Sequence, residues 1–204
     1  MIWRKKRFRS NRHQMAEDNQ LVQRAVANGP AAFRQLVEKY QYFVFTITMR
    51  VLRSREEAEE AAQDTFIKVH RTLGAFEQKS KFSTWLYTIA YRTALDHARR
   101  KRLPVDSIED EENYRQIEDE GTPTPVEHTQ HLDLRDQLQL AIEQLPPQDG
   151  LIISLFYLHE RSVREIAEIT GLTVTNVKTK LHRLRERLRE TLEKQLHTEI
   201  EDWL

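Results

Sequence analysis

Polar and basic side chains near the C-terminal end of the sequence have the chemistry to bind DNA. They follow a short segment that begins at Ser162 and ends at the turn residue Gly171, and they open a longer basic segment. A short capped helix, a glycine-containing turn and a longer basic helix are typical of a helix-turn-helix, although a helical hairpin with a solvated basic face has the same pattern. Such side chains can donate to phosphates and to base edges in a major groove. The candidate contacts are Thr175, Asn176, Lys178, Thr179, His182 and Arg183.

Aromatic and basic side chains are interleaved between residues 76 and 102. The aromatic members are Phe76, Phe82, Trp85, Tyr87 and Tyr91, and the basic members are Lys79, Lys81, Arg92, Arg99, Arg100, Lys101 and Arg102. Rings on which bases can stack, together with cations that follow the backbone, suit single-stranded nucleic acid. The same rings could instead form a helical core, and we expect Trp85 and Tyr91 to be partly buried in either case.

No pattern in the sequence is typical of catalysis. Cysteine is absent, the eight histidines are scattered, and their one close pair, His128 and His131, falls in a linker-like segment. We recognise no metal-ligand spacing, phosphate-binding glycine loop or activated nucleophile. We therefore expect no enzymatic activity, no metal site and no cofactor, and we interpret the histidine pair as a chance surface feature.

Helices must position these groups, because the spacing of apolar residues predicts helices throughout the first hundred residues. We expect a short helix over residues 20–28 and a long one over 30–52, with Pro30 in its first turn. The next apolar stripe runs from Ala58 to Leu73 and stops at Gly74. A third long helix, capped by Ser83, should run to about Arg102.

A second helical unit follows a segment rich in acids and prolines. Helices are predicted over residues 132–145 and 148–157, separated by Pro146 and Pro147. Ser162 and Glu165 have the spacing of a capping box, and Thr173 should cap the long final helix. The predicted fold is all-α, with two small helical domains joined by a flexible acidic linker, and the second is a helix-turn-helix domain.

Composition and charge exclude a membrane-spanning or disulfide-linked protein. The 204 residues are 39% hydrophobic and 31% charged, and they include no run of 18 apolar residues. The lack of cysteine agrees with a reducing cytosol, so we expect a cytoplasmic protein without membrane insertion. The net charge is zero, yet residues 1–13, 79–102 and 174–189 are basic while 104–130 hold nine acids. Basic blocks on either side of an acidic linker suggest two surfaces for a polyanion.

Several separated motifs resemble the extracytoplasmic-function (ECF) sigma factors of bacterial RNA polymerase. They stand in the family's order and spacing from about Asp18 to Leu188. The matching segments are 18–22, 32–36 with Tyr40, 58–69 (AEEAAQDTFIKV), 81–90 (KFSTWLYTIA), 145–147 (LPP), 165–167 (EIA) and 177–183 (VKTKLHR).

The resemblance implies a protein that binds core RNA polymerase and directs it to promoter DNA. In this family the N-terminal helical domain docks on the clamp of the largest polymerase subunit. That role would fall to the stripe Glu60, Asp64, Ile67 and Arg71. An exposed isoleucine among charges suits a partner surface, although the stripe could also be a solvated face with one stray apolar residue.

The resemblance also assigns two DNA sites. The loop over residues 74–82 and the helix start after it would capture the non-template strand of the minus-ten element. The candidates there are Lys79, Lys81, Phe82, Ser83, Thr84 and Trp85, with Arg92, Asp96, Arg99 and Arg100 for the flanking duplex. The helix-turn-helix would read the minus-thirty-five element as duplex through the six residues named first.

Further expectations concern the domain bounds, the linker and control. The predicted parts are a basic extension (1–14), the N-terminal sigma domain (15–103), an acidic linker (104–130), the helix-turn-helix domain (131–196) and a tail (197–204). The linker would lie along the polymerase's RNA path and mimic a nucleic-acid chain there, or it is only a solvated spacer. Control in this family comes most often from an anti-sigma protein, so we expect such a partner.

One alternative function stays open at this point. A helix-turn-helix regulator that acts without polymerase docking would share the C-terminal pattern, but it would carry a receiver or ligand domain in place of the N-terminal motifs.

Residues 1–14 precede the family pattern, and Met15 would be a conventional start. The segment is either a cationic arm that adds DNA affinity or the result of a misassigned start codon. We predict that residues 15–204 suffice for function. Deleting residues 1–14 should leave transcription from a cognate promoter intact in a reconstituted assay, and its loss would contradict the prediction.

Overall fold

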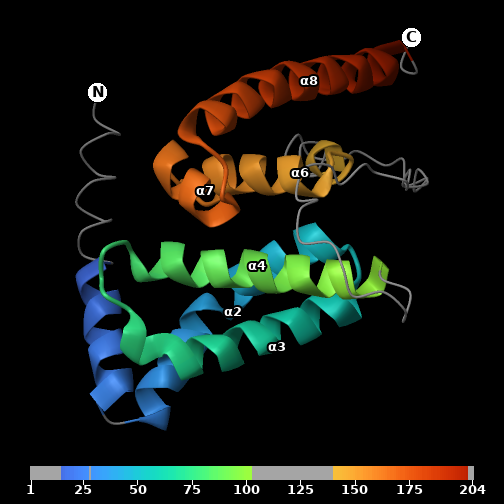
Figure 1. Cartoon of the computed structure of the whole chain (residues 1–204). Helices are drawn as coiled ribbons and strands as arrows, with labels where there is room; N and C mark the ends of the chain where they lie inside the picture. Colours follow the sequence, from blue (N-terminus) through green and yellow to red (C-terminus); the bar gives the residue numbers. More distant parts are fainter. Residues whose placement is uncertain (1–14, 28, 103–139, 202–204) are drawn as a thin grey trace. The chain divides into compact units, whose positions relative to one another are not determined.

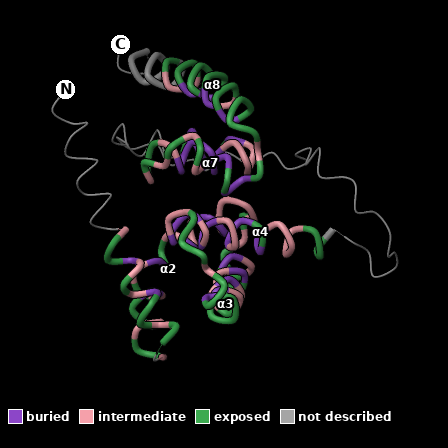
Figure 2. The backbone as a smooth tube through the Cα atoms, turned by 60° about the vertical axis from the view of Figure 1, so that its left-hand side comes forward, coloured by how far each residue is buried: buried purple, intermediate pink, exposed green. Residues whose placement is uncertain are grey.

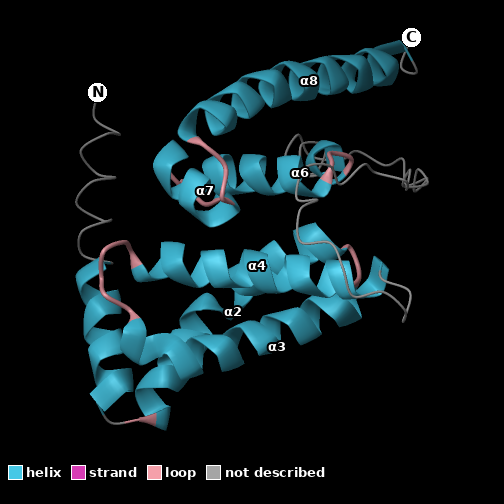
Figure 3. Cartoon of the chain, viewed as in Figure 1, coloured by secondary structure: helices cyan, strands magenta, loops and turns pink. Residues whose placement is uncertain are grey.

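The structure is a computed structural model that describes residues 15–27, 29–102 and 140–201. Among these residues every regular element is helical, and no strand occurs (Figure 3). The predicted all-α class is therefore confirmed. None of the described helices is long and apolar enough to cross a bilayer. The linker over 104–130, the extension 1–14 and the pair His128 and His131 lie outside the described residues.

The chain forms two units, and the first extends to Lys101. It contains a helix over residues 15–27, α2 (Pro30–Leu52), α3 (Arg55–Thr72), the 3₁₀ turn η1 (Leu73–Ala75) and α4 (Phe82–Arg102) (Figure 1). The long helix predicted over 30–52 has those bounds, and the short helix predicted from residue 20 is already present at residue 15, the first described residue. Leu73 and Gly74 leave the α-helical path, as the glycine predicted.

The cap predicted for α4 is wrong. The amides of Thr84 and Trp85 both donate to the carbonyl oxygen of Lys81, at 3.0 and 3.1 Å. Lys81 therefore precedes the helix, and Ser83 is its second residue, with a buried side chain. Phe82 is also buried, and this burial explains why the helix starts one residue before the polar cap candidate.

The core of the first unit combines large apolar side chains with small ones that let the helices approach closely. α2 buries Leu36, Tyr40, Val44 and Ile47 against its neighbours. α3 contributes Ala58, Ala61, Thr65 and Val69, and α4 contributes Leu86, Ala90 and Ala94. Side chains this small let helices approach closely, and the Thr48 hydroxyl on α2 donates to the carbonyl of Ala58 on α3 at 2.9 Å. Each helix thereby buries one side and leaves the other for solvent or a partner (Figure 2).

A buried carboxylate ties the first helix to α2. Asp18 is 3% exposed, and it accepts hydrogen bonds from the Lys39 ammonium at 2.6 Å and from the Tyr40 hydroxyl at 2.5 Å. Tyr40 in turn contacts Phe82 and Tyr87 edge-on, with ring centroids 5.6 and 6.3 Å apart. The motif at the start of the family pattern thus anchors the N-terminal helix to the aromatic core.

The second unit holds almost all of the chain from Arg102 onward. Its described elements are helical residues 140–143, α6 (Pro147–Ile153), the π-helical turn η2 (Ser154–Leu158), α7 (Val163–Thr170) and α8 (Val174–Glu201). Pro147 opens α6, so the prolines separate two helices as predicted, and the helix predicted over 148–157 ends in the π turn. Helix α8 continues to Glu201, so residues 197–201 of the predicted tail are helical.

Replacing Asp18 with alanine should lower the free energy of unfolding by about 2–3 kcal/mol, because Lys39 and Tyr40 would lose a buried charged acceptor. Urea unfolding followed by circular dichroism measures this change. Gln20→Ala, at an exposed position of the same helix, should stay within about 0.5 kcal/mol of the unmodified chain. Equal effects of the two changes would contradict the anchoring role.

Candidate nucleic-acid and partner interfaces

Local hydrogen bonds that the sequence predicts define the helix ends of the helix-turn-helix. The Ser162 hydroxyl accepts from the Glu165 amide at 3.3 Å, and the Glu165 carboxylate accepts from the Ser162 amide at 2.9 Å. The predicted capping box is therefore confirmed. α7 ends at Gly171, whose φ of 74° is a left-handed conformation that favours glycine. The Thr173 hydroxyl then accepts from the Asn176 amide at 3.2 Å, which confirms the predicted cap of α8.

Apolar packing fixes the angle at which the second helix of the motif leaves the turn. Ile166 on α7 and Val177 and Leu181 on α8 are buried, as the spacing predicted. Val163 and Leu172 are only half-buried. Because these residues occupy the inner side of α8, its other side is left to the polar residues.

All six predicted contacts of the recognition helix are exposed: Thr175, Asn176, Lys178, Thr179, His182 and Arg183. They recur at three and four residues, so they share the outer side of the first turns of α8. Amide and guanidinium groups at this spacing can meet adenine and guanine edges, while hydroxyls and Lys178 can reach phosphates.

Two polar contacts that the sequence did not predict hold α8 in place. The Lys180 ammonium donates to the Asp149 carboxylate on α6 at 2.7 Å. The Arg185 guanidinium donates to the Tyr157 hydroxyl at 2.6 Å and lies 5.4 Å from the ring centroid of Phe156. Basic residues that look alike in the sequence therefore differ: Lys180 and Arg185 contact residues of preceding segments, whereas Lys178 and Arg183 belong to the exposed outer side.

The predicted minus-ten segment divides into buried and accessible residues. Phe82, Ser83 and Thr84 are at most 3% exposed, so in this conformation their side chains pack in the interior and hold the segment in place. Trp85 is half-buried, and its ring lies 5.1 Å from that of Phe76 and 5.9 Å from that of Phe82 between centroids. The three rings form one aromatic cluster, of which Trp85 and Phe76 reach the surface.

The cations around this cluster lie in different environments. Lys79 is exposed and pairs with Glu77, whereas Lys81 is half-buried. Further along α4, Arg92, Arg99 and Arg100 are exposed and Asp96 is half-buried. These four positions are spaced by four, three and one residues, so they share one side of the helix. α4 thus presents a mainly basic side with one carboxylate in it.

The predicted partner stripe is a continuous side of α3. Glu60, Ile67 and Arg71 are exposed, and Asp64 is half-buried. Ile67 is 47% exposed, which is unusual for an isoleucine on a charged helix. The structure adds a shallow groove of about 240 Å³ beside it, lined by Phe33, Phe66, Ile67, His70 and Arg71. Phe33 and Phe66 are only half-buried, so their rings are accessible from the groove.

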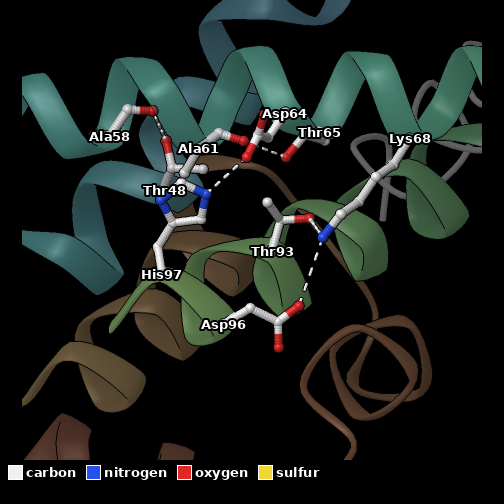
Figure 4. A network of polar contacts seen from close by, with 9 residues as sticks. All are labelled: Thr48, Ala58, Ala61, Asp64, Thr65, Lys68, Thr93, Asp96 and His97. Atoms are coloured by element: carbon white, nitrogen blue, oxygen red, sulfur yellow. Dashed lines mark hydrogen bonds and ion pairs between the residues drawn. The ribbon is translucent and has the colours of Figure 1, made fainter. Parts of the chain in front are cut away.

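Polar bonds cross from α3 to α4 beside both of these sides (Figure 4). His97 Nε2 lies 2.9 Å from an Asp64 carboxylate oxygen. The Lys68 ammonium lies 3.1 Å from the Thr93 hydroxyl and 3.5 Å from the Asp96 carboxylate. Sequence analysis did not single out Lys68 or His97, because the bonds join residues 25 or more positions apart that only the packing brings together.

The described residues include no group of three or more histidine, aspartate, glutamate or cysteine side chains arranged to hold a metal ion. Instead, the described acidic residues of α3 and α4 mainly pair with basic residues, as Glu57 does with Lys101 at 2.7 Å. The accessible chemistry of these parts of the chain is hydrogen bonding, charge and ring stacking.

Comparison with known proteins defines the class. The family model for Sigma-70 region 2 matches residues 36–103, and that for Sigma-70, region 4 matches residues 135–188. The first match covers α2 to α4 with the turn between them, and the second contains the helix-turn-helix. The fold and the two matched regions are those of a sigma-70-type initiation factor.

Curated relatives narrow the class to one family. The ECF RNA polymerase sigma factor SigW of Bacillus subtilis is 35% identical over 167 residues, which cover 79% of this chain and 89% of SigW. The RNA polymerase sigma-H factor of Pseudomonas aeruginosa is 33% identical, with 87% of this chain and 94% of that protein covered. This chain belongs to the family of ECF RNA polymerase sigma factors, and the predicted resemblance is confirmed.

Solved structures share the fold. CnrH, in complex with the cytosolic domain of CnrY, aligns with a TM-score of 0.59 at 20% identity, covering 87% of this chain and 97% of CnrH. The sigma factor RpoE from Bartonella quintana, in complex with the anti-sigma factor NepR, aligns with a TM-score of 0.56 at 24% identity, covering 79% of this chain and 96% of RpoE.

The capping box makes a specific stability prediction. Ser162→Ala should destabilise the second unit by about 1 kcal/mol, because the Glu165 amide would lose its acceptor. Glu165→Gln should cost less, since an amide oxygen can still accept from the Ser162 amide, although the contact with Arg161 at 4.0 Å loses its charge. Thermal unfolding monitored by circular dichroism compares the two, and a larger loss for Glu165→Gln would contradict the assignment.

Proposed function

We propose that this chain docks on core RNA polymerase through α3, opens the minus-ten element with the start of α4 and reads the minus-thirty-five element with α8. One observation carries the proposal above all. A capped helix-turn-helix with six exposed polar residues on its outer side follows, in the same chain, a separate helical unit that matches region 2. An ordinary DNA-binding regulator has no use for that unit, so the alternative without polymerase docking is disfavoured.

Docking would use the stripe Glu60, Asp64, Ile67 and Arg71. The groove beside Ile67 offers an apolar seat for a side chain of the partner, and the flanking charges would set the orientation of the partner helix. Phe33 and His70 form one wall of the groove through an edge-on contact, with ring centroids 4.8 Å apart. The stripe alone would be a weak polar surface, and the groove gives it an apolar anchor.

Strand capture would take place at the aromatic cluster. Trp85 and Phe76 offer partly exposed rings for an unstacked base, and Lys79 and Lys81 lie on the approach to α4. Phe82, Ser83 and Thr84 would hold this platform in place rather than contact DNA directly. Arg92, Asp96, Arg99 and Arg100 would meet the flanking duplex, where a carboxylate can accept from an exposed base amine.

Duplex reading would fall to Thr175, Asn176, Lys178, Thr179, His182 and Arg183. Arg183 and Asn176 have the side chains that best discriminate guanine and adenine, and the others would fix the register through phosphates. On this proposal the protein acts in the cytoplasm and has no catalytic activity of its own, because polymerase performs the chemistry. An anti-sigma protein, like the one bound to RpoE in the complex named above, would control access to these faces.

Two substitutions test whether α3 binds core polymerase and α8 reads DNA. Ile67→Glu should lower the affinity of the chain for core polymerase about tenfold or more, since it places a charge in an apolar seat. Arg183→Ala should leave core affinity unchanged and lower promoter-dependent transcription about tenfold, the effect of losing one base contact. Fluorescence titration with labelled core polymerase and transcription from a cognate promoter measure the two effects. Unchanged core affinity of Ile67→Glu would contradict docking through α3.

A further inference from the structure

We propose that Lys68 and His97 are crossed positioning residues. Each lies on one helix of the first unit and fixes the orientation of a carboxylate on the functional side of the other helix. Lys68 on the docking helix α3 holds Asp96 on the DNA side of α4. His97 on α4 holds Asp64 on the docking side of α3. The inference rests on the proposed function, because it uses the two sides assigned there.

The geometry of the two pairs is reciprocal (Figure 4). Lys68 Nζ lies 3.5 Å from an Asp96 carboxylate oxygen, and it donates at 3.1 Å to the hydroxyl of Thr93, which is 1% exposed. His97 Nε2 lies 2.9 Å from an Asp64 carboxylate oxygen. The carboxylate accepts, so the ring nitrogen donates. The Asp64 side chain is 41% exposed, against 12% for His97. The side chains of Asp96 and Lys68 are equally exposed, at 44% each.

Lys68 matters for DNA because of the charges around Asp96. Arg92, Arg99 and Arg100 give this side of α4 a positive potential, and Asp96 is its one acidic residue between positions 92 and 100. A nearby ammonium offsets the repulsion between this carboxylate and phosphates, and it fixes the direction in which the carboxylate can accept from a base. Thr93 anchors the ammonium, so Lys68 is held at this place rather than free in solvent.

His97 contributes to docking because, without its bond, the Asp64 side chain could adopt several rotamers. The ring is mostly buried, and its bond to the carboxylate restricts the directions in which the Asp64 side chain can point. A preorganised acceptor loses less conformational freedom when a partner binds. His97 itself lies on the helix assigned to DNA, outside the four residues expected to contact it.

The fold does not depend on either pair. The buried apolar side chains of the unit, among them Ala58, Ala61, Ala90 and Ala94, form a core to which neither pair belongs. Lys101 and Glu57 form a third bridge from α4 to α3 at 2.7 Å. Partly exposed ion pairs contribute little to stability, so variants at Lys68 and His97 should fold.

The first arm of the test measures DNA binding by holoenzyme. A promoter fragment that the holoenzyme transcribes serves as the probe. Lys68→Met should weaken binding about threefold to tenfold and leave the affinity for core polymerase unchanged. In an Asp96→Asn background the same change should have no further effect, since Lys68 acts only through that carboxylate. Arg55→Met is the matched control, because it removes an α3 cation whose partner, Glu59, lies on the same helix.

The second arm measures the affinity for core polymerase. His97→Leu should weaken it about threefold to tenfold, whereas His97→Gln should largely retain it, because the glutamine amide can replace the Nε2 donor. In an Asp64→Asn background, His97→Leu should add nothing. Circular dichroism and thermal unfolding of each variant check that the helices are intact.

The outcomes separate the two proposals. Absence of core binding or transcription by the unmodified chain would overturn the proposed function and this inference with it. If the unmodified chain is active but Lys68→Met or His97→Leu has its full effect in the asparagine backgrounds, only the crossed positioning is wrong. An effect of Lys68→Met on core affinity alone would also overturn it.

Discussion

Close packing of α2, α3 and α4 through small buried side chains is the constraint on which the first unit depends. Ala58, Ala61, Ala90 and Ala94 have no measurable exposure, and Thr48 reaches the backbone of Ala58 across the helices. Larger buried side chains, such as Tyr40, Phe82 and Tyr87, fill the rest of the core. Replacing any of these alanines with a larger residue would separate the helices and displace every functional side chain that they carry.

That constraint explains why polar residues of α3 and α4 meet at the edges of the packed seam. Helices this close bring long side chains within bonding distance of the neighbouring helix, as with Lys68 and Asp96 or His97 and Asp64. The second unit uses a different device, because its recognition helix is fixed at one end by the turn at Gly171 and along its length by Lys180 and Arg185. In both units the residues expected to bind a partner lie on helices whose position is fixed by packing and hydrogen bonds to their neighbours.

Local signals made much of this structure predictable from the sequence. Pro30 and Gly171 mark helix ends through their backbone conformation. The Ser162 and Glu165 pair and Thr173 do so through bonds within a few residues, and each of these ends was assigned correctly. Ser83 was assigned wrongly because burial of Phe82 outweighed a polar cap. The groove beside Ile67 and the crossed pairs of Lys68 and His97 could not be predicted, since they arise only when helices distant in the sequence are packed together. Membership of the sigma family was recognisable because several motifs stand in one order.

The account claims that this chain gives core RNA polymerase a promoter specificity. Run-off transcription with purified core polymerase on genomic DNA fragments, with and without the chain, tests that claim most directly. The account predicts new discrete transcripts that require the chain and whose start sites share minus-ten and minus-thirty-five elements. Transcripts that are identical with and without the chain, together with no binding to core polymerase, would contradict it and leave a DNA-binding protein that acts alone.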